Sequence, residues 1–319
     1  MPDPMNDRDI VIVFGAGASY GAGHVLPAAP PLGLDLYDAL ATQYPNVWGP
    51  HSHIGKMWAD KLRRDFERTM AEDVVPWVPS LTLLEWHRCV SQFFARYSLE
   101  EHGRDCYSML LSGLRTKGLL ARVTFGTLNY DCLLEEAIAR LGIDVDYLLD
   151  DFVSPSSIPL AKIHGSCNFV SIDLGSRREL LTNANASAVE CGFDRLPLTK
   201  LPERLQDKFG RHEQAFFPVL SLYSPYKPSI LAPVKLQGLR NTLTQRLTQT
   251  IAVLIVGIKP NPQGDQHLWD PIAQSSAPKI LYVGSTADFD VLKRLQHRSV
   301  HLAETFEKAV APILSAFPS

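Results

Sequence analysis

The chain has 319 residues, of which 45% are apolar and 20% are charged, and its formal net charge is -3. This composition is typical of a packed globular protein and excludes a largely disordered chain. No block of Lys or Arg forms a basic stripe, which argues against duplex nucleic acid as a partner.

The sequence carries no signal for export or for insertion into a membrane. It begins with MPDPMNDRD, which is polar, whereas a secretory signal needs a basic start followed by an apolar run. The longest apolar stretch, residues 251–258, is too short to cross a membrane. We therefore expect a cytoplasmic protein.

The cysteines lie far apart and include no CxxC pair, so neither a disulfide framework nor a zinc site is expected. We predict no metal site in the chain. Reduced and mostly buried thiols are predicted at Cys89, Cys106, Cys132, Cys167 and Cys191.

The first third of the chain contains one predicted strand and then a helical region. Residues 9–14 form a β-branched apolar run that stops at glycine, which is typical of a strand buried on both faces of a parallel sheet. Residues 21–33 are rich in Gly, Ala and Pro and are predicted as a surface loop. From 34 to about 117, apolar residues recur at helical spacing, which predicts an insertion of about four helices.

The rest of the chain alternates between predicted strands and helices. Strands are predicted at 119–126, 159–163, 168–172, 251–257 and 279–284, and helices at 131–141, 238–248, 265–275 and 303–316. In residues 175–235 the apolar residues show no regular spacing, so this region is predicted as loops with short helices. The alternation indicates an α/β fold, a doubly wound Rossmann-like parallel sheet with a helical insertion lobe. We expect one domain over residues 1–319, with the insertion at about 34–118 and the remainder of the core at 119–319.

The first candidate site follows the first strand directly, in the motif Phe14-Gly15-Ala16-Gly17-Ala18-Ser19. Glycines there let the backbone turn tightly and approach a phosphate, while a helix N-terminus and the Ser19 hydroxyl supply donors. Tyr20 replaces the third glycine of GxGxxG, and no acidic strand end follows about twenty residues later, which disfavours an ordinary dehydrogenase. A glycine-rich turn that binds no ligand is the alternative.

A second candidate site is Thr127-Leu128-Asn129-Tyr130-Asp131, where polar residues follow a predicted strand at the edge that binds ligands in open α/β sheets. Asn129 carries a strand-end amide that needs partners, which a ribose or an attacking water could provide. Asp131 is either part of the site or the N-cap of the following helix.

A third candidate site, Lys162-Ile163-His164-Gly165-Ser166, also lies at a strand end. A histidine titrates near neutral pH and can act as a general base, and the following glycine could let a ligand pass close to the backbone. A single histidine of this kind is more often structural, but its place in a series of strand-end motifs favours a functional role.

Two more predicted strands end in glycine, at Gly257 and at Gly284-Ser285. In a doubly wound sheet both would border the same crevice and line the ribose and adenine ends of a ligand. Between them, in the sequence GDQHLWD, Asp265 and His267 either cap a helix or belong to the site.

In this order the motifs resemble those of the sirtuin-like family. Gly15-Ala16-Gly17-Ala18-Ser19 is similar to the family's phosphate loop, residues 127–131 to its TQNID segment, and His164-Gly165-Ser166 to its catalytic His-Gly. The resemblance spans nearly the whole chain. It is greatest for a divergent bacterial branch with TxNYD and K-x-HGS, whose members are NAD-hydrolysing effectors of antiphage defence.

The resemblance implies that the protein is an NAD glycohydrolase, with NAD as its substrate and no metal. It implies that Asn129 holds the nicotinamide ribose and positions water, that His164 acts as base at a ribose hydroxyl, and that Asp131 supports the nicotinamide end. An oxocarbenium-like ribosyl centre needs such positioning and electrostatic support more than a strong nucleophile. The residues expected to bind NAD are Gly15, Ala16, Gly17, Ala18, Ser19, Thr127, Gly165, Ser166, Gly257, Gly284 and Ser285.

The chain departs from the protein-deacylating sirtuins in two ways. It lacks their zinc module with two CxxC pairs, and Leu128 replaces the Gln of TQNID, which together disfavour deacylation but are compatible with hydrolysis. The alternatives are a protein ADP-ribosyl or deacyl transferase, and a sensor or scaffold that binds NAD or ADP-ribose without turnover. Because free NAD cleavage would harm a host cell, we expect regulation through a homo-oligomer or a complex with a sensor or ATPase partner.

Overall fold

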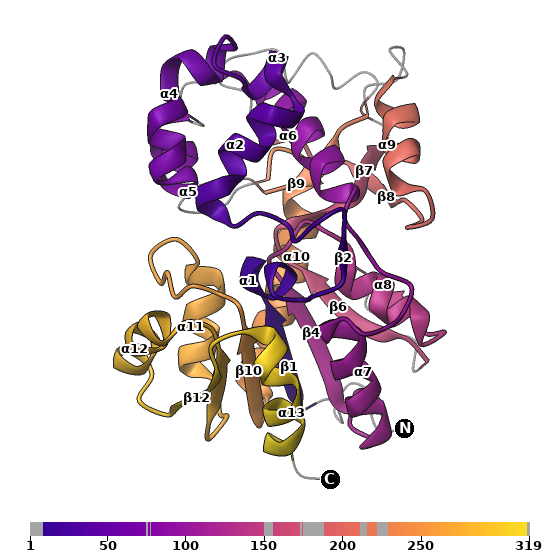
Figure 1. The fold of residues 1–319 in the computed structure, drawn as a ribbon, viewed down its shortest axis with the longest axis vertical. Helices are drawn as coiled ribbons and strands as arrows, with labels where there is room; N and C mark the ends of the chain where they lie inside the picture. The colour runs from indigo at the N-terminus through magenta and orange to yellow at the C-terminus, as the bar shows by residue number, and fades with distance from the viewer. Residues whose placement is uncertain are drawn as a thin grey trace.

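The computed structural model describes residues 9–317 apart from 75, 77, 150–155, 173, 175–187, 211–215 and 222–228. One half of the molecule is built on a sheet of seven parallel strands, in the order β12-β11-β10-β1-β4-β6-β5 (Figure 1). The strands are β1 (Ile10–Phe14), β4 (Val123–Thr127), β5 (Val145–Asp146), β6 (Ile158–Lys162), β10 (Ala252–Val256), β11 (Ile280–Val283) and β12 (Ser299–Ala303).

The register aligns the carboxyl ends of the central strands. Phe14 at the end of β1 lies opposite both Val256 of β10 and Thr127 of β4, and Thr127 in turn lies opposite Lys162 of β6. Every residue of β1, β4 and β6 is buried, as expected for strands covered on both faces. The chain runs from β1 toward β6 on one side and returns to β10 on the other, so the strand order reverses between β1 and β10. Ligands of doubly wound folds bind at such a reversal.

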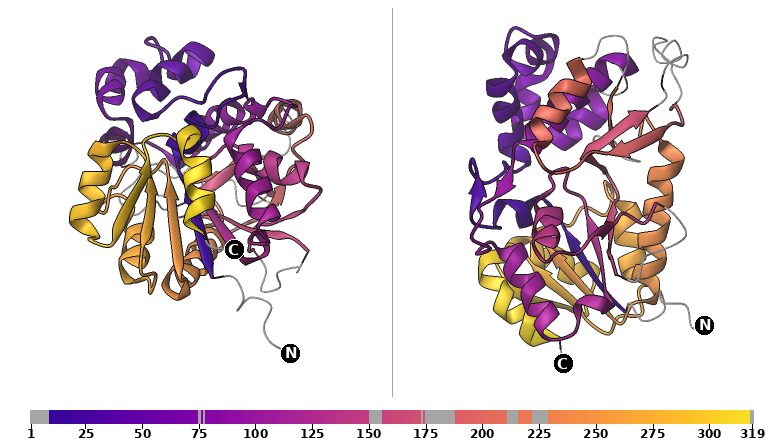
Figure 2. Two further views of the ribbon diagram at one scale, coloured as in Figure 1. Left: turned by 60° about the horizontal axis from the view of Figure 1, so that its bottom comes forward. Right: turned by 90° about the vertical axis from the view of Figure 1, so that its right-hand side faces the viewer.

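Helices cover both faces of this sheet, as the two views of Figure 2 show. On one face α7 packs between α8 and α13, and on the other α10 packs against α11, while α12 lies beside β12. These helices are α7 (Cys106–Thr116), α8 (Leu133–Arg140), α10 (Pro233–Gln249), α11 (Gln266–Gln274), α12 (Thr286–Leu295) and α13 (Phe306–Ala316). The predicted α/β fold with a doubly wound, Rossmann-like parallel sheet is confirmed.

A second lobe lies beyond the carboxyl ends of the strands and is built from two separate segments of the chain (Figure 1). The first segment is helical, and its α6 packs against the antiparallel sheet β8-β7-β9 and the helix α9 of the second segment. The elements are α2 (Gly33–Gln43), α3 (Pro45–Trp48), α4 (His53–Arg64), α5 (Phe66–Thr69), a π-helix (Met70–Val74), α6 (Ser80–Ala95), β7 (Gly165–Ile172), β8 (Gly192–Arg195), α9 (Leu201–Gly210) and β9 (Pro218–Leu220).

Aromatic packing ties the flanking helices to the central strand. The ring of Phe14 on β1 lies 5.2 Å from that of Tyr107 on α7 and 5.8 Å from that of Phe306 on α13, and it stacks on Phe125 of β4 at 6.1 Å. All four side chains are buried. Such clusters add directional contacts to the area that they remove from water, so β1 and α7 hold a fixed geometry below the site.

Several predicted boundaries were wrong. The strand predicted at 119–126 begins only at Val123, because Leu120–Arg122 form a 3-10 turn in which Arg122 pairs with Asp9 at 2.6 Å. The helix predicted at 303–316 begins at Phe306, because Thr305 caps it and residues 299–303 form the edge strand β12.

Other elements were missed altogether. The predicted loop 21–33 contains β2 (Val25–Leu26), which pairs with β3 (Ser98–Leu99), and α12 was not foreseen because it buries one side chain, Leu292. Within 175–235 the structure has β8, α9 and β9, which are too short or too polar to give a period, whereas 175–187, 211–215 and 222–228 lie outside the described residues. Helix α10 begins at Pro233, earlier than predicted, since proline suits the first turn.

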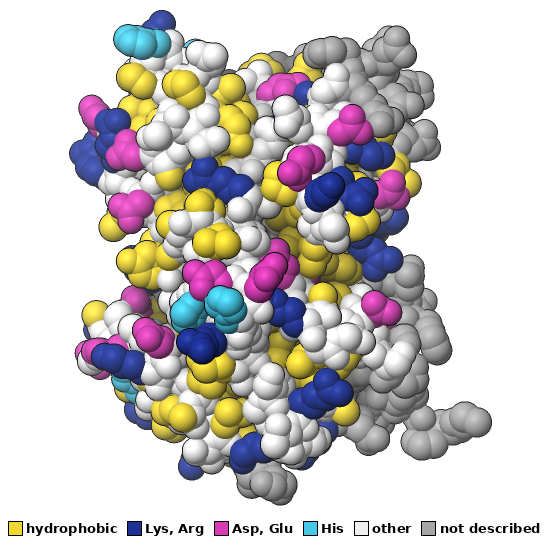
Figure 3. Space-filling view, turned by 45° about the vertical axis from the view of Figure 1, so that its right-hand side comes forward, with side chains coloured by type: hydrophobic (Ala, Val, Ile, Leu, Met, Phe, Trp, Pro, Cys, Tyr) yellow, Lys and Arg dark blue, Asp and Glu magenta, His cyan; other side chains and the backbone are white. Residues whose placement is uncertain are grey.

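The expectation of reduced, buried cysteines is confirmed, because all five are free and buried. In the part of the chain that the structure describes, no helix combines the length and apolar character that a membrane crossing requires. Figure 3 shows acidic and basic side chains interspersed on the face that it displays, without a continuous stripe of one sign.

Candidate nucleotide site

The segments that follow β1, β4 and β6 lie side by side at the carboxyl edge of the sheet. The hydrogen-bond ladder continues past the strands, since the Leu128 amide donates to the Phe14 carbonyl at 3.0 Å and the Ile163 amide to the Thr127 carbonyl at 3.3 Å. Farther on, the Cys167 amide donates to the Tyr130 carbonyl at 2.8 Å. The structure thus brings together the three motifs that the sequence predicted as a site.

Asn129 lies between the β4 segment and the turn after β1. Its Nδ2 donates to the Gly15 carbonyl and to the Ser19 hydroxyl, both at 2.9 Å, and its side chain is 8% exposed. Because a carbonyl can only accept, the amide cannot be turned around, and its oxygen faces away from both contacts. Within the described residues Oδ1 accepts no hydrogen bond, so it is left to bind a hydroxyl or a water.

Ser19 connects Asn129 to a residue that the sequence did not single out. The Ser19 hydroxyl lies 3.1 Å from the hydroxyl of Tyr107 on α7. Burial raises the pKa of Tyr107 well above its ordinary value, so the phenol stays protonated and available for this bond. Tyr107 lies in the region predicted as a helical insertion, and no local pattern distinguished it from a core aromatic.

The glycines of the first turn pack against the end of β10. The Gly15 amide donates to the Val256 carbonyl and the Gly17 amide to the Gly257 carbonyl, each at 2.9 Å. Gly257 has φ +64, and a Cβ there would lie 2.2 Å from the Ala18 nitrogen. These glycines therefore allow the two segments to touch, and the amides of Gly15 and Gly17 are engaged within the protein. Ala16, which begins the short helix α1 (Ala16–Tyr20) and forms the tip of this segment, is exposed.

Asp131 is buried behind Asn129 and contacts the first turn of α8. Its carboxylate accepts from the Leu133 amide at 3.2 Å, although the N-cap residue of α8 is Cys132 and not Asp131, while its backbone carbonyl accepts from Lys162. Burial raises the pKa of Asp131, and the Lys162 charge opposes that shift.

Lys162 also pairs with Glu135 at 2.9 Å, and both side chains are at most 2% exposed. Burial alone would lower the pKa of Lys162, but the carboxylate of Glu135 and the neighbouring acidic groups outweigh it and raise the pKa. A charged ammonium thus lies directly beneath the segment that carries Asn129 and Asp131.

His164 lies in the two-residue link between β6 and β7 and is 3% exposed. Gly165 has φ +80, and a Cβ there would lie 2.1 Å from the Val219 carbonyl oxygen, so β9 fills the space that the sequence interpretation left for a ligand. Ser166 is fully buried, with its hydroxyl 3.7 Å from the Cys132 sulfur.

Two residues of the sequence GDQHLWD lie against His164. The Nε2 atoms of His164 and His267 are 3.0 Å apart, and Asp265 Oδ1 is 3.8 Å from His164 Nε2. Asp265 occupies the N-cap position of α11, but its side chain makes no capping hydrogen bond to that helix. Sequence spacing could not pair His164 with His267, because they come from opposite sides of the sheet's centre.

The remaining predicted residues also lie at the carboxyl edge of the sheet. The Gly284 amide donates to the Ala303 carbonyl at 3.0 Å, and the Ser285 hydroxyl caps α12 by accepting from the Asp288 amide at 3.1 Å. Thr127 is buried, and its hydroxyl accepts from the Asn129 amide at 3.1 Å. These contacts stabilise the fold, and a role of Thr127, Gly284 and Ser285 in ligand binding stays a prediction.

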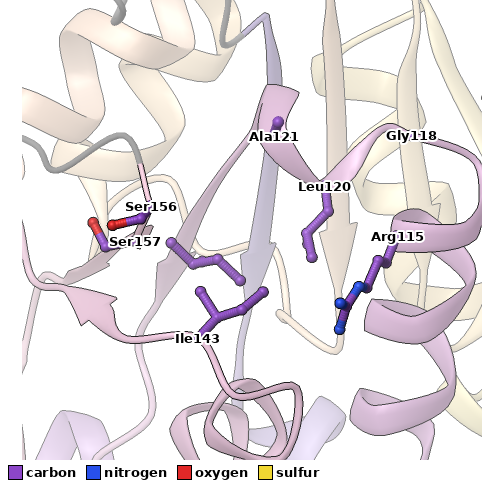
Figure 4. A pocket seen from close by; sticks show the side chains of 8 residues that line it. Arg115, Gly118, Leu120, Ala121, Ile143, Ser156 and Ser157 are labelled. Carbon is purple, nitrogen blue, oxygen red and sulfur yellow. The ribbon is translucent and has the colours of Figure 1, made fainter.

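A cavity of about 270 Å³ lies at the other edge of the sheet, where β6 begins and the turn before β4 lies (Figure 4). It is lined by Arg115, Gly118, Leu120, Ala121, Ile143, Ser156, Ser157 and Ile158. Since ligands of doubly wound sheets bind at the carboxyl ends of the strands, this cavity is separate from the candidate site.

Comparison with known proteins gives matches only among solved structures. No family model and no curated protein matches the chain. A structure described as a Sir2 homolog–NAD complex is 12% identical, with 99% of this chain and 93% of that chain covered and a TM-score of 0.48. A structure on the mechanism and regulation of Sir2 enzymes is 13% identical, covering 98% and 92%, with a TM-score of 0.46.

A third structure, of a Sir2 homologue mutant with ADP-ribose, is 13% identical, covers 99% of this chain and 98% of that chain, and has a TM-score of 0.43. At such identities and TM-scores the similarity carries no argument about function. The function of this chain has to be argued from the residues at the carboxyl edge of its sheet.

Proposed function

We propose that the protein is an NAD glycohydrolase, which cleaves the bond between nicotinamide and ribose with water to give nicotinamide and ADP-ribose. The observation that carries this proposal is the state of Asn129. Both N–H groups of its amide are fixed by the turn after β1, and its oxygen is left as an acceptor in a nearly dry site. A group of this kind can orient a ribose hydroxyl or an attacking water.

This reaction depends less on a strong nucleophile than on electrostatic stabilisation of the ribosyl centre by the groups around it. As nicotinamide leaves, positive charge spreads over the ribosyl carbon and ring oxygen, and water then adds to that carbon. Fixed dipoles and nearby negative charge stabilise such a centre more strongly in a dry site than in water. Asn129 supplies a fixed carbonyl dipole and His164 an imidazole that can take a proton from a ribose hydroxyl.

We infer that NAD binds along the carboxyl edge of the sheet. The turn Gly15–Ser19 and the strand end at Gly257 border the point where the strand order reverses, which is where dinucleotides bind in this class of fold, and Gly284 lies one strand farther along. Asp131 would then support the nicotinamide end through its buried carboxyl group. The two engaged glycine amides limit the phosphate contacts of this turn to its exposed tip at Ala16.

The proposal includes a biological role for the reaction and a way in which it is controlled. The likeness of the three motifs to a sirtuin-like branch of NAD-hydrolysing effectors supports a role in bacterial antiphage defence. Cleavage of NAD without control would deplete the host, so activity is proposed to wait for assembly or for a sensor or ATPase partner.

The test compares nicotinamide and ADP-ribose release by the wild-type protein and by Asn129→Ala and His164→Ala variants. Matched controls are Asn241→Ala and His297→Ala, because these residues are exposed and lie on α10 and after α12. Chromatography follows the products with and without candidate partners, and calorimetry follows NAD binding separately. We expect release that the controls retain and that both site variants lose by at least about a hundredfold.

Two outcomes would contradict the proposal. Saturable binding of NAD with no release under any condition would leave a sensor or scaffold. Transfer of ADP-ribose or of an acyl group to or from a protein, without free ADP-ribose, would leave a protein-modifying enzyme.

A further inference from the structure

Three side chains with metal-binding atoms converge beside the proposed site. His164 comes from the link after β6, and Asp265 and His267 come from the start of α11. One ligand atom from each residue lies within 4.8 Å of the others. Two imidazole nitrogens 3.0 Å apart can share a single proton, but Asp265 Oδ1, at 3.8 Å from His164 Nε2, lies beyond hydrogen-bond distance from that atom.

We propose that His164, Asp265 and His267 bind a divalent metal ion of the zinc type, with both histidines ligating through Nε2 and the aspartate through one carboxylate oxygen. Two imidazoles and one carboxylate are the donors that zinc accepts in open sites, where a fourth position is left for water. This site differs in place and in donor type from a four-cysteine zinc module.

The distances fit such a site after a small adjustment. With zinc–nitrogen bonds of about 2.05 Å, nitrogens 3.0 Å apart subtend an angle of about 95° at the metal, and a tetrahedral angle needs about 3.3 Å. The carboxylate of Asp265 has to move inward by about 1 Å, which a change of its side-chain torsion can supply.

Access and charge decide which ligands contribute most. His267 is partly exposed, whereas His164 and Asp265 are buried, so an ion would enter past the His267 ring. The charge of Arg240 on α10 acts on Asp265 while its guanidinium donates to the Ile163 carbonyl at 3.0 Å. A fixed cation nearby weakens the attraction for a metal, so the two imidazoles are expected to carry most of the affinity.

A metal at this place would act on the proposed reaction, and this second step rests on the proposed function. The Nε2 lone pair of His164 that would accept a proton is the one that ligates the ion. Zinc binding and proton transfer therefore exclude each other at that nitrogen, and zinc is expected to inhibit nicotinamide release.

The experiment titrates Zn²⁺ by calorimetry into full-length protein that has been freed of metal with a chelator. The variants are His267→Ala and Asp265→Asn, with His297→Ala as the control, and circular dichroism checks that each is folded. Co²⁺ is used as a second probe, because its visible absorption bands report the type of ligand and the coordination geometry. We expect one site in the wild type and in the control, and at least about tenfold weaker binding in His267→Ala.

The outcomes separate the two steps. Folded wild-type protein that binds no Zn²⁺, or a His267→Ala variant that binds it equally well, overturns the metal site and leaves a hydrogen-bonded histidine pair. If no NAD is ever cleaved, the titration still decides the metal site. If NAD is cleaved, saturating Zn²⁺ should lower nicotinamide release by the wild type at least about tenfold and leave the release by His267→Ala unchanged. An equal effect of Zn²⁺ on both proteins refutes the inhibition.

Discussion

Replacing Lys162 by methionine should test whether the buried ion pair beneath the site maintains its geometry. Glu135 would keep a carboxylate in a site that is at most 2% exposed, with only the Tyr147 hydroxyl at 3.5 Å as a remaining partner among the described residues. Its Oε2 already lacks a hydrogen bond there. Removing one partner of such a pair typically costs about 3–5 kcal/mol, and we expect Lys162→Met to fall in that range.

The assay is urea unfolding of the single variant and of the double variant Lys162→Met/Glu135→Leu. With a slope near 3 kcal/mol per molar urea, the single variant's midpoint should fall by about 1–1.7 M. The double variant should recover at least about 2 kcal/mol, because a well-packed apolar pair carries no desolvation cost.

Two results would refute this reasoning. A loss below about 1 kcal/mol in Lys162→Met would mean that water or another cation compensates the charge of Glu135. A double variant as unstable as the single one would mean that Lys162 acts through its packing and not through its charge.

Three further predictions follow from single residues. Gly257→Ala places a Cβ 2.2 Å from the Ala18 nitrogen at φ +64, so it should lower the free energy of unfolding in urea by about 1–3 kcal/mol. The control Gly238→Ala, in an open helical position, should raise it by about 0.5–1 kcal/mol. Equal effects of the two substitutions would contradict the close approach of the two loops. Burial lowers the pKa of His87 to about 3, so below about pH 6.5 the unfolded chain binds a proton at this residue that the folded chain does not. The free energy of unfolding should therefore fall by about 2 kcal/mol from pH 7 to pH 5 because of His87. A His87→Leu variant whose stability falls equally steeply with pH would disprove this. The hydrogen bond with Cys167, together with burial, raises the pKa of the Cys132 thiol. Mass spectrometry after brief iodoacetamide treatment should therefore find Cys132 unlabelled in folded protein and labelled after denaturation.

The parts of the fold that the sequence predicted are those with a strong local pattern. Strands β1, β10 and β11 are short apolar runs that end at glycine, and the rule that ligands bind at carboxyl strand ends placed Asn129 and His164 correctly at one edge. Edge strand β12 and helix α12 each bury one residue, Ser299 and Leu292, so a search for buried apolar faces does not find them.

What the sequence could not provide is contact between distant residues. Glu135 on α8 pairs with Lys162 at the end of β6, and His164 meets His267 on α11. Both contacts arise because the sheet brings the segments that follow separate strands to one edge. The close contact of Gly257 with the first turn is of the same kind, since the need for glycine there arises from a neighbour and not from its own loop.

The link between β6 and β7 has a mechanical consequence. Only Ile163 and His164 separate a strand of the seven-stranded sheet from a strand of the three-stranded sheet in the other lobe. A rotation of one lobe against the other would change the backbone torsions at this link together with those of the other segments that join the two lobes. Because His164 belongs to this link, a ligand or partner that draws the lobes together would change the orientation of its imidazole directly.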